Sequence, residues 1–261
     1  MATEAAPARP VGPTRLVYFD DMWALRSAAT VLAVHQEGGR VVVVLDATVF
    51  YPQGGGQPAD TGAISGAGAK FLVEDVRAKD GVVFHYGRFE GAGEGCGHGF
   101  KEGESVSLEV DAERRSLNSR LHSAGHLLDI CVSNVGLSYL EPGKGYHFPD
   151  GPFVEYKGVI PPDQIQDKQN ELEREAKRLI SEGAKVLASV FPYEEAAKLC
   201  GGSLPSYISK DSTPRIVKFG EYPGGACGGT HVVDISIINS LKVTNIRVKK
   251  GLTKVSYSIS P

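Results

Sequence analysis

The chain has 261 residues, of which 41% are hydrophobic and 23% charged, as in an ordinary globular protein with one large domain or two small ones. No apolar run approaches the ~18 residues that cross a bilayer, which excludes a transmembrane helix and predicts no membrane partner. The net charge of -3 excludes the overall basic excess of proteins that wrap nucleic acid, so any RNA contact must be local or small.

The N-terminal residues 1–14 are rich in alanine and proline. They lack the apolar stretch of a secretory signal and the repeated arginine of a transit peptide, so we expect a disordered tail on a cytoplasmic protein. The four cysteines form no CxxC pair, and without a secretory signal they should stay reduced. They are Cys96, Cys131, Cys200 and Cys227. Only Cys227 lies in a context that indicates a ligand or a nucleophile rather than a buried apolar side chain.

Residues 15–110 show the pattern of an all-β domain. Short apolar runs recur between glycine-rich breaks, which is typical of a small barrel or sandwich. The expected strands are 29–34, 40–45, 70–76, 82–86 and 105–110. The segment 87–103 holds seven glycines in seventeen residues, and we expect a mobile loop there that includes Cys96 and His98.

The pattern changes near residue 110, which predicts a domain boundary and an α+β domain over 111–261. Asp111 is a candidate N-cap for a helix that reaches Cys131, because apolar residues recur at three- and four-residue spacing. A second helix with a charged outer face is expected from Asp163 to Ile180. Strands then return, at 215–219, 234–238, 241–248 and 254–259.

Basic residues gather near the C-terminus and are the one local candidate for an RNA contact. On charge alone, a solvated strand face explains them better. They are Lys242, Arg247, Lys249, Lys250 and Lys254.

Two histidines four residues apart lie on one face of the first predicted helix. At this spacing, His122 and His126 can reach a single metal ion. The same pattern would arise from two exposed histidines or from two at a packing edge. The sequence between them, Ser123-Ala124-Gly125, has no glutamate to act as the general base of a metalloprotease, so that mechanism is disfavoured.

The second half of the predicted metal site is Cys227-Gly228-Gly229-Thr230-His231. Its two glycines allow a tight turn between Cys227 and His231. Three imidazoles and one thiolate form a common tetrahedral set for one Zn²⁺ ion. Four protein ligands are usual in structural zinc sites, so catalysis requires one ligand to give way to water or substrate. The other histidines outside the glycine-rich loop are isolated in the sequence, and we expect surface or satisfied-core roles for them: His35, His85 and His147.

Together these motifs resemble the editing domain of alanyl-tRNA synthetases and its free-standing relatives, the AlaX alanyl-tRNA editing proteins. The segment Asp46–Gly62 supports this, with a Thr-x-Phe-Tyr start followed by Gly-Gly-Gln and Asp-x-Gly. The resemblance covers residues 46–231. It implies a β-barrel of the translation-factor type over 15–110 and, over 111–261, a zinc-binding α+β editing domain of the type that threonyl- and alanyl-tRNA synthetases share. One departure is Ser-Ala-Gly between the histidines, where many members have Thr-Ala-Thr or a similar trio.

The resemblance also implies an activity, the hydrolysis of the ester bond that joins a wrong amino acid to the acceptor end of tRNA(Ala). The expected substrates carry serine and, second, glycine. A synthetase pocket distinguishes such small side chains by only about 1–3 kcal/mol, which calls for a second, hydrolytic site. The chain has no nucleotide-binding signature, so no nucleotide cofactor is expected, and we expect a monomer. Two alternatives stay open: a zinc-stabilised tRNA-binding module without activity, and a hydrolase of another small ester or amide.

Site roles follow from the resemblance. Thr48 is the candidate that recognises the serine hydroxyl, although a plain strand residue is the competing interpretation. Gln57 is the candidate that positions water or the scissile carbonyl. Cys227 is a catalytic metal ligand, and as a metal-bound thiolate it is a weak candidate for a covalent nucleophile. The expected substrate-binding residues are Gly54, Gly55, Gly56 and Thr230, and the expected metal ligands are His122, His126, Cys227 and His231.

Overall fold

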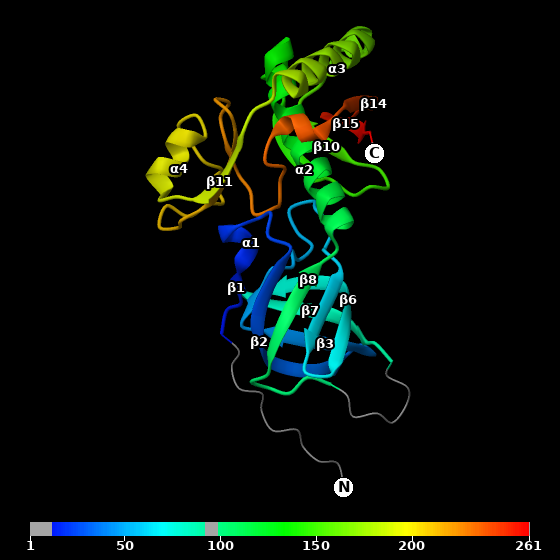
Figure 1. Cartoon of the computed structure of the whole chain (residues 1–261). Helices are drawn as coiled ribbons and strands as arrows, with labels where there is room; N and C mark the ends of the chain where they lie inside the picture. The colour runs from blue at the N-terminus through cyan, green and yellow to red at the C-terminus, as the bar shows by residue number, and fades with distance from the viewer. Residues whose placement is uncertain (1–11, 92–98, 261) are drawn as a thin grey trace. The chain divides into compact units, whose positions relative to one another are not determined.

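A computed structural model describes residues 12–91 and 99–260. Most of the predicted tail, and Cys96 and His98 with the centre of the glycine-rich loop, lie outside these residues. Residue contacts divide the chain into two compact units, which we call the barrel unit and the α+β unit (Figure 1). The barrel unit comprises Met1–Tyr18, Ala24–Gln53 and Ala59–Asp111, and the α+β unit comprises Phe19–Trp23, Gly54–Pro58 and Ala112–Pro261. The glycine-rich motif Asp46–Gly62, which we predicted to lie wholly in the barrel domain, is thus divided between the two units.

The barrel unit is a closed barrel with strand order β2-β3-β7-β6-β5-β8. All five strands predicted in this half form, and the mixed α+β class is confirmed. Every second residue of β8 is buried, namely Val106, Leu108 and Val110, because alternate side chains of a strand point into the barrel. The elements are β1 (Arg15–Leu16), α1 (Val17–Asp20), β2 (Arg26–Glu37), β3 (Arg40–Leu45), β4 (Ala47–Thr48), β5 (Gly62–Gly66), β6 (Ala69–Lys79), β7 (Val82–Phe89) and β8 (Ser105–Val110).

A buried histidine inside the barrel has both ring nitrogens engaged. His85 Nδ1 lies 3.0 Å from the carbonyl oxygen of Val43, which can only accept, so Nδ1 carries the hydrogen. Its Nε2 therefore accepts from the Thr48 hydroxyl at 2.8 Å, and Thr48 Oγ1 in turn accepts from the Phe50 amide at 3.1 Å. His85 is the satisfied core residue that the sequence predicts, whereas His35 is exposed on β2.

The buried imidazole of His85 should make the stability of the protein depend on pH. Burial lowers the pKa of His85 to about 4, so between pH 4 and 6.5 the unfolded chain binds the extra proton and stability is lost as pH falls. For this group, the free energy of unfolding should drop by about 2 kcal/mol between pH 7.5 and pH 5. Urea unfolding of the wild type and of His85→Asn at both pH values measures this, and equal pH dependence in the two proteins would contradict it.

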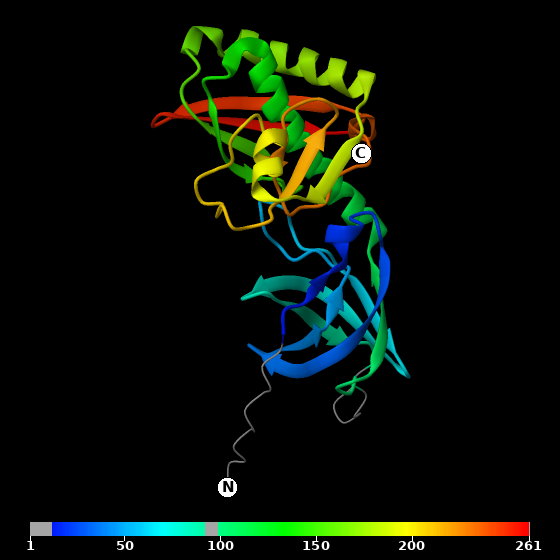
Figure 2. The same cartoon turned by 90° about the vertical axis from the view of Figure 1, so that its left-hand side faces the viewer.

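The α+β unit contains two sheets. The larger one has strand order β14-β15-β10-β9, and its buried residues share one core with α2 and α3 (Figures 1 and 2). The smaller one, β11-β12-β13, has α4 beside it, seen in yellow in Figure 2. The elements are α2 (Ala112–Val132), β9 (Glu141–Tyr146), β10 (Phe153–Lys157), α3 (Ile165–Glu182), β11 (Val186–Val190), α4 (Tyr193–Leu199), β12 (Arg215–Phe219), β13 (Gly225–Ala226), β14 (Leu241–Lys249) and β15 (Leu252–Ile259).

The structure confirms both predicted helices and three of the four strands predicted after residue 210. The strand predicted at 234–238 is wrong, because Ile235–Ile238 forms a 3₁₀ turn. Asp234 explains the difference, since its side chain accepts a hydrogen bond from the Ser236 amide at 3.0 Å and so caps the turn. Within the described residues, no helix has the length and apolar character needed to span a membrane.

Candidate metal centre

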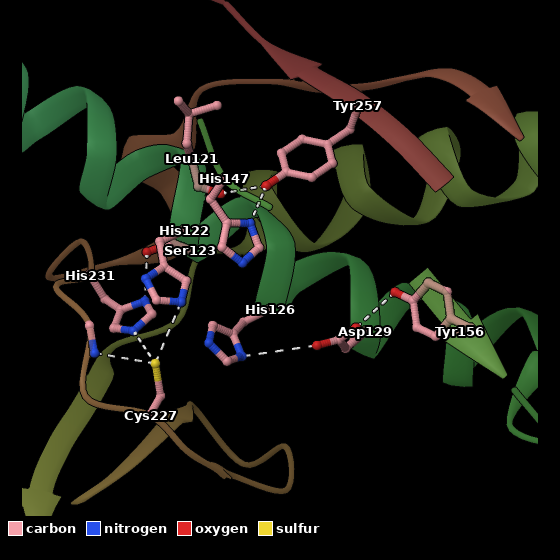
Figure 3. A network of polar contacts seen from close by, with 11 residues as sticks. Leu121, His122, Ser123, His126, Asp129, His147, Tyr156, Cys227, His231 and Tyr257 are labelled. Atoms are coloured by element: carbon pink, nitrogen blue, oxygen red, sulfur yellow. Dashed lines mark hydrogen bonds and ion pairs between the residues drawn. The ribbon is translucent and has the colours of Figure 1, made fainter. Parts of the chain in front are cut away.

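Four side chains from two distant parts of the α+β unit converge on one point (Figure 3). His122 and His126 come from α2, while Cys227 and His231 lie in the loop after β13, and one donor atom of each lies within 4.8 Å of the others. Cys227 Sγ is 3.5 Å from His122 Nε2 and 3.4 Å from His231 Nε2. In a tetrahedral zinc site, neighbouring donor atoms lie roughly 3.3–3.6 Å apart. These side chains therefore fit a single metal ion.

An oxygen atom lies within 4.0 Å of Nδ1 in each of the three imidazoles. His122 Nδ1 lies 2.8 Å from Gln57 Oε1, which can only accept, so Nδ1 carries the hydrogen and the Nε2 lone pair is free for an ion. His231 Nδ1 lies 3.3 Å from the Ser123 hydroxyl, which also accepts from the Val232 amide. Such partners orient metal-binding histidines and hold them in the required tautomer.

The third histidine has a carboxylate nearby. His126 Nδ1 lies 4.0 Å from Asp129 Oδ2, and the other oxygen of Asp129 accepts from the Tyr156 hydroxyl at 2.7 Å. Hydrogen bonds at Nδ1 thus leave Nε2 of His122 and of His231 for a metal ion. The 4.0 Å separation at His126 is longer than a hydrogen bond.

Burial keeps the four donors in a state suited to a cation. It lowers the pKa of His126 to about 4, and it lowers the pKa values of His122 and His231 well below their ordinary range. The imidazoles are therefore neutral at pH 7 with lone pairs available. Burial raises the pKa of the Cys227 thiol, so binding of a metal ion there releases a proton.

The loop that carries Cys227 is held by a buried arginine. Arg215 Nη1 donates to the carbonyl oxygens of Cys227 and Gly229, each at 2.9 Å. The Cys227 amide in turn donates to the Arg215 carbonyl at 3.0 Å. The Trp23 indole donates to the His231 carbonyl at 3.1 Å, which holds the other end of the loop. Hydrogen bonds to the backbone of this loop, most of them from the Arg215 and Trp23 side chains, thus place both of its ligands.

The two glycines of the loop differ in the space around them. A Cβ on Gly229 would lie 2.2 Å from Cε1 of His122 and 2.9 Å from Gln57 Oε1. A Cβ on Gly228 would meet only the ring of Phe19, at 3.7 Å. Only Gly229 is therefore required for close packing of the two halves of the site.

Both the oxygen and the nitrogen of the Gln57 side-chain amide form hydrogen bonds within the protein. Besides His122, Gln57 Oε1 accepts from the Thr230 amide at 3.0 Å, and Nε2 donates to Thr230 Oγ1 at 2.9 Å. Thr230 Oγ1 also lies 2.8 Å from the Ser119 hydroxyl. Gln57 and Thr230 are both fully buried. Gln57 holds the His122 ring, and Thr230 holds Gln57.

The glycines before Gln57 form an exposed tight turn. The Gly54 and Gln57 backbones are paired, and Gly55 and Gly56 have φ values of 52° and 80°, a conformation that favours glycine. Thr48 is fully buried in the barrel unit, where His85 and Phe50 engage its hydroxyl.

Several residues of the centre carry no signal in the sequence. Arg215 begins an apolar run and looks like an ordinary strand residue, and His147 is isolated. Ser123 is the exception, because its position between two histidines of one helix indicates that it lies near them. Trp23 precedes the first predicted strand and belongs to no motif.

Comparison with known proteins first relates part of the chain to a family of tRNA synthetases. A sequence model of the family described as tRNA synthetases class II (A) matches residues 11–114. The chain therefore carries a segment related to a tRNA synthetase family.

Individual proteins of similar sequence define the relationship more closely. The chain is 32% identical over 245 residues to the alanyl-tRNA editing protein AlaX-L of Pyrococcus horikoshii, an alignment that covers 93% of this chain and 57% of that protein. It is 32% identical over 233 residues to the alanine–tRNA ligase of Methanothrix thermoacetophila, covering 88% of this chain and 24% of that ligase. With the ligase of Methanosarcina mazei the identity is 30% over 250 residues, covering 94% and 26%.

These alignments confirm the resemblance that the motifs predict: the chain is a relative of alanyl-tRNA editing proteins and of a segment of the alanine–tRNA ligases. It spans 57% of the editing protein and about a quarter of the length of each ligase.

Proposed function

We propose that this chain is an editing hydrolase that cleaves the ester bond of mischarged tRNA(Ala), chiefly seryl-tRNA(Ala) and also glycyl-tRNA(Ala). The observation that carries the proposal is the convergence of one donor atom from each of His122, His126, Cys227 and His231 within 4.8 Å. The similarity to an alanyl-tRNA editing protein supports the substrate class. The zinc-binding role of the α+β unit and the translation-factor type of the barrel are parts of the same proposal.

The four side chains are proposed to hold one Zn²⁺ ion. A zinc ion in such a site supplies Lewis acidity, polarising a bound oxygen or lowering the pKa of bound water. His122 and His231 are buried, whereas His126 and Cys227 are partly exposed, so a substrate reaches the centre from the side of His126 and Cys227.

Gln57 is better described as a positioning residue than as a catalytic one. Its oxygen accepts from His122 and from the Thr230 amide, which leaves no exposed acceptor for water or for a substrate. The turn Gly54–Gly56 is exposed on two of its three residues and is the part of the motif that can approach a terminal adenosine closely. Thr230, predicted from the sequence to bind substrate, is proposed here to support Gln57.

Thr48 is proposed to stabilise the barrel instead of selecting serine. Its hydroxyl donates to His85 and accepts from the Phe50 amide, and none of the residue is exposed. Recognition of a serine hydroxyl therefore falls to another group.

The acceptor end of tRNA is the proposed partner. Strands β14 and β15 and the turn between them carry the basic cluster predicted from the sequence, and Lys242, Arg247 and Lys249 on β14 are exposed. The Lys254 ammonium lies 3.5 Å from the centroid of the Phe153 ring, a cation–π contact that holds this lysine on the sheet. This surface supplies local positive charge in a chain whose net charge is -3.

The test measures release of radiolabelled serine from seryl-tRNA(Ala), with alanyl-tRNA(Ala) as the discrimination control. Cys227→Ala should lose both bound zinc and serine release, while Cys200→Ala, a half-buried cysteine outside the cluster, should keep both. Trp23 is the one tryptophan in the chain and donates to the carbonyl of His231, so its fluorescence should change on zinc removal. Stoichiometric zinc without serine release would reject the enzyme and favour the tRNA-binding module.

A further inference from the structure

A fourth imidazole lies against the metal centre without joining the donor set. His147 follows β9, and its ring stacks on that of His122 with centroids 4.6 Å apart and an angle of 22° between the planes (Figure 3). Its residue surface is 5% exposed. The four-residue cluster of donor atoms does not include it.

Three glycines make the space that this ring fills. A Cβ on Gly125 would lie 2.3 Å from Cε1 of His147, and a Cβ on Gly145 would lie 2.6 Å from Nε2. A Cβ on Gly56 would lie 3.1 Å from Cδ2, and the Gly56 carbonyl accepts from the His147 amide at 2.8 Å. Gly125 is, with Ser123, one of the two positions at which the first histidine motif departs from the Thr-Ala-Thr pattern. A threonine at that position would exclude the ring, so Gly125 and His147 form a matched pair.

A tyrosine sets the tautomer of His147. The Tyr257 hydroxyl donates to the carbonyl oxygen of Leu121 at 2.9 Å, so its oxygen accepts from His147 Nδ1 at 2.7 Å (Figure 3). The hydrogen of the neutral ring therefore sits on Nδ1, and Nε2 keeps a lone pair. Across residues 12–91 and 99–260, no hydrogen-bond donor engages that lone pair.

We propose that His147 is a further catalytic residue for the ester hydrolysis proposed above, and that its Nε2 accepts a hydrogen bond from the attacking water. This inference rests on the proposed function. The oxygen of the water bonds to the carbonyl carbon, the bond to the ribose oxygen breaks, and a proton of the water passes to that departing oxygen. His147 orients the water and ends the cycle in its starting neutral form.

Two variants of similar size separate catalysis from packing. His147→Gln retains an acceptor near the position of Nε2, whereas His147→Met fills the space without one. In single-turnover deacylation, the maximal rate of His147→Met should fall about 100-fold, as for a misplaced reacting group, with unchanged half-saturation and zinc content. His147→Gln should stay within about tenfold of the wild type.

Two further variants test the surroundings of His147. Gly125→Ala should displace the ring and lower the rate as much as His147→Met, and the double variant should be no slower than either, since both remove the same group. Long-range ¹H–¹⁵N spectra should show the Nδ1–H tautomer of His147 in the wild type and a mixture in Tyr257→Phe.

The outcomes are distinguishable. A wild type that releases serine, together with a His147→Met variant that keeps zinc and the wild-type rate, would overturn this inference alone. Equal losses of rate in His147→Gln and His147→Met, accompanied by loss of zinc, would also overturn it by showing a packing role. A wild type with bound zinc and no serine release would reject the proposed function, and this inference with it.

Discussion

Replacing Gly229 with alanine should abolish metal binding, whereas Gly228→Ala should leave it intact. The new Cβ at position 229 would lie 2.2 Å from the His122 ring, which is held in place by stacking on His147 and by its hydrogen bond to Gln57. Since loss of a mere supporting partner costs about 10–100-fold in metal affinity, displacement of a ligand ring should cost at least about 100-fold. Neither glycine has a positive φ, so the contrast isolates the steric effect.

Zinc titration followed by Trp23 fluorescence measures the affinity of both variants, and serine release should fall in parallel with bound zinc. Circular dichroism of the metal-free proteins controls for misfolding. Stoichiometric zinc at wild-type affinity in Gly229→Ala would show that His122 is not a ligand in the position described.

Gln57→Met should lower zinc affinity about 10–100-fold, because the methionine fills the space but holds neither His122 nor Thr230. Loss of the amide leaves three buried polar groups without this partner: His122 Nδ1, the Thr230 amide and Thr230 Oγ1. At about 1–3 kcal/mol for each, the free energy of unfolding should drop by about 3 kcal/mol or more. The decrease should be largest for the metal-loaded protein, where His122 must hold one orientation.

Gln57→Glu is the matched control, because a carboxylate still accepts from His122 and from the Thr230 amide. It should retain more zinc affinity than Gln57→Met when both are measured by competition with a chelator. A Gln57→Met protein with wild-type zinc affinity and a large loss of serine release would contradict the positioning role. That outcome would restore the catalytic role predicted from the sequence.

Local pattern was sufficient to predict much of the fold. The apolar spacing between Asp111 and Cys131 predicted α2, and alternation with glycine breaks predicted most of the barrel strands, because helix and strand periodicity depend on neighbouring residues. The strand predicted at 234–238 was wrong because the Asp234 side chain caps a 3₁₀ turn there. Strands β9, β10 and β11 were missed, since their short runs lack a distinctive pattern.

The sequence by itself also determined the candidate ligands, because each pair, His122 with His126 and Cys227 with His231, lies within one local segment of fixed geometry. Only the tertiary structure decided what surrounds them. Gln57 contacts Thr230 across 173 positions, and Tyr257 orients His147 across 110. Such pairings depend on how whole elements pack, and short-range spacing does not encode them. For that reason, the sequence predicted the donor set, whereas the hydrogen bonds that fix its tautomers and the imidazole of His147 emerged only from the folded chain.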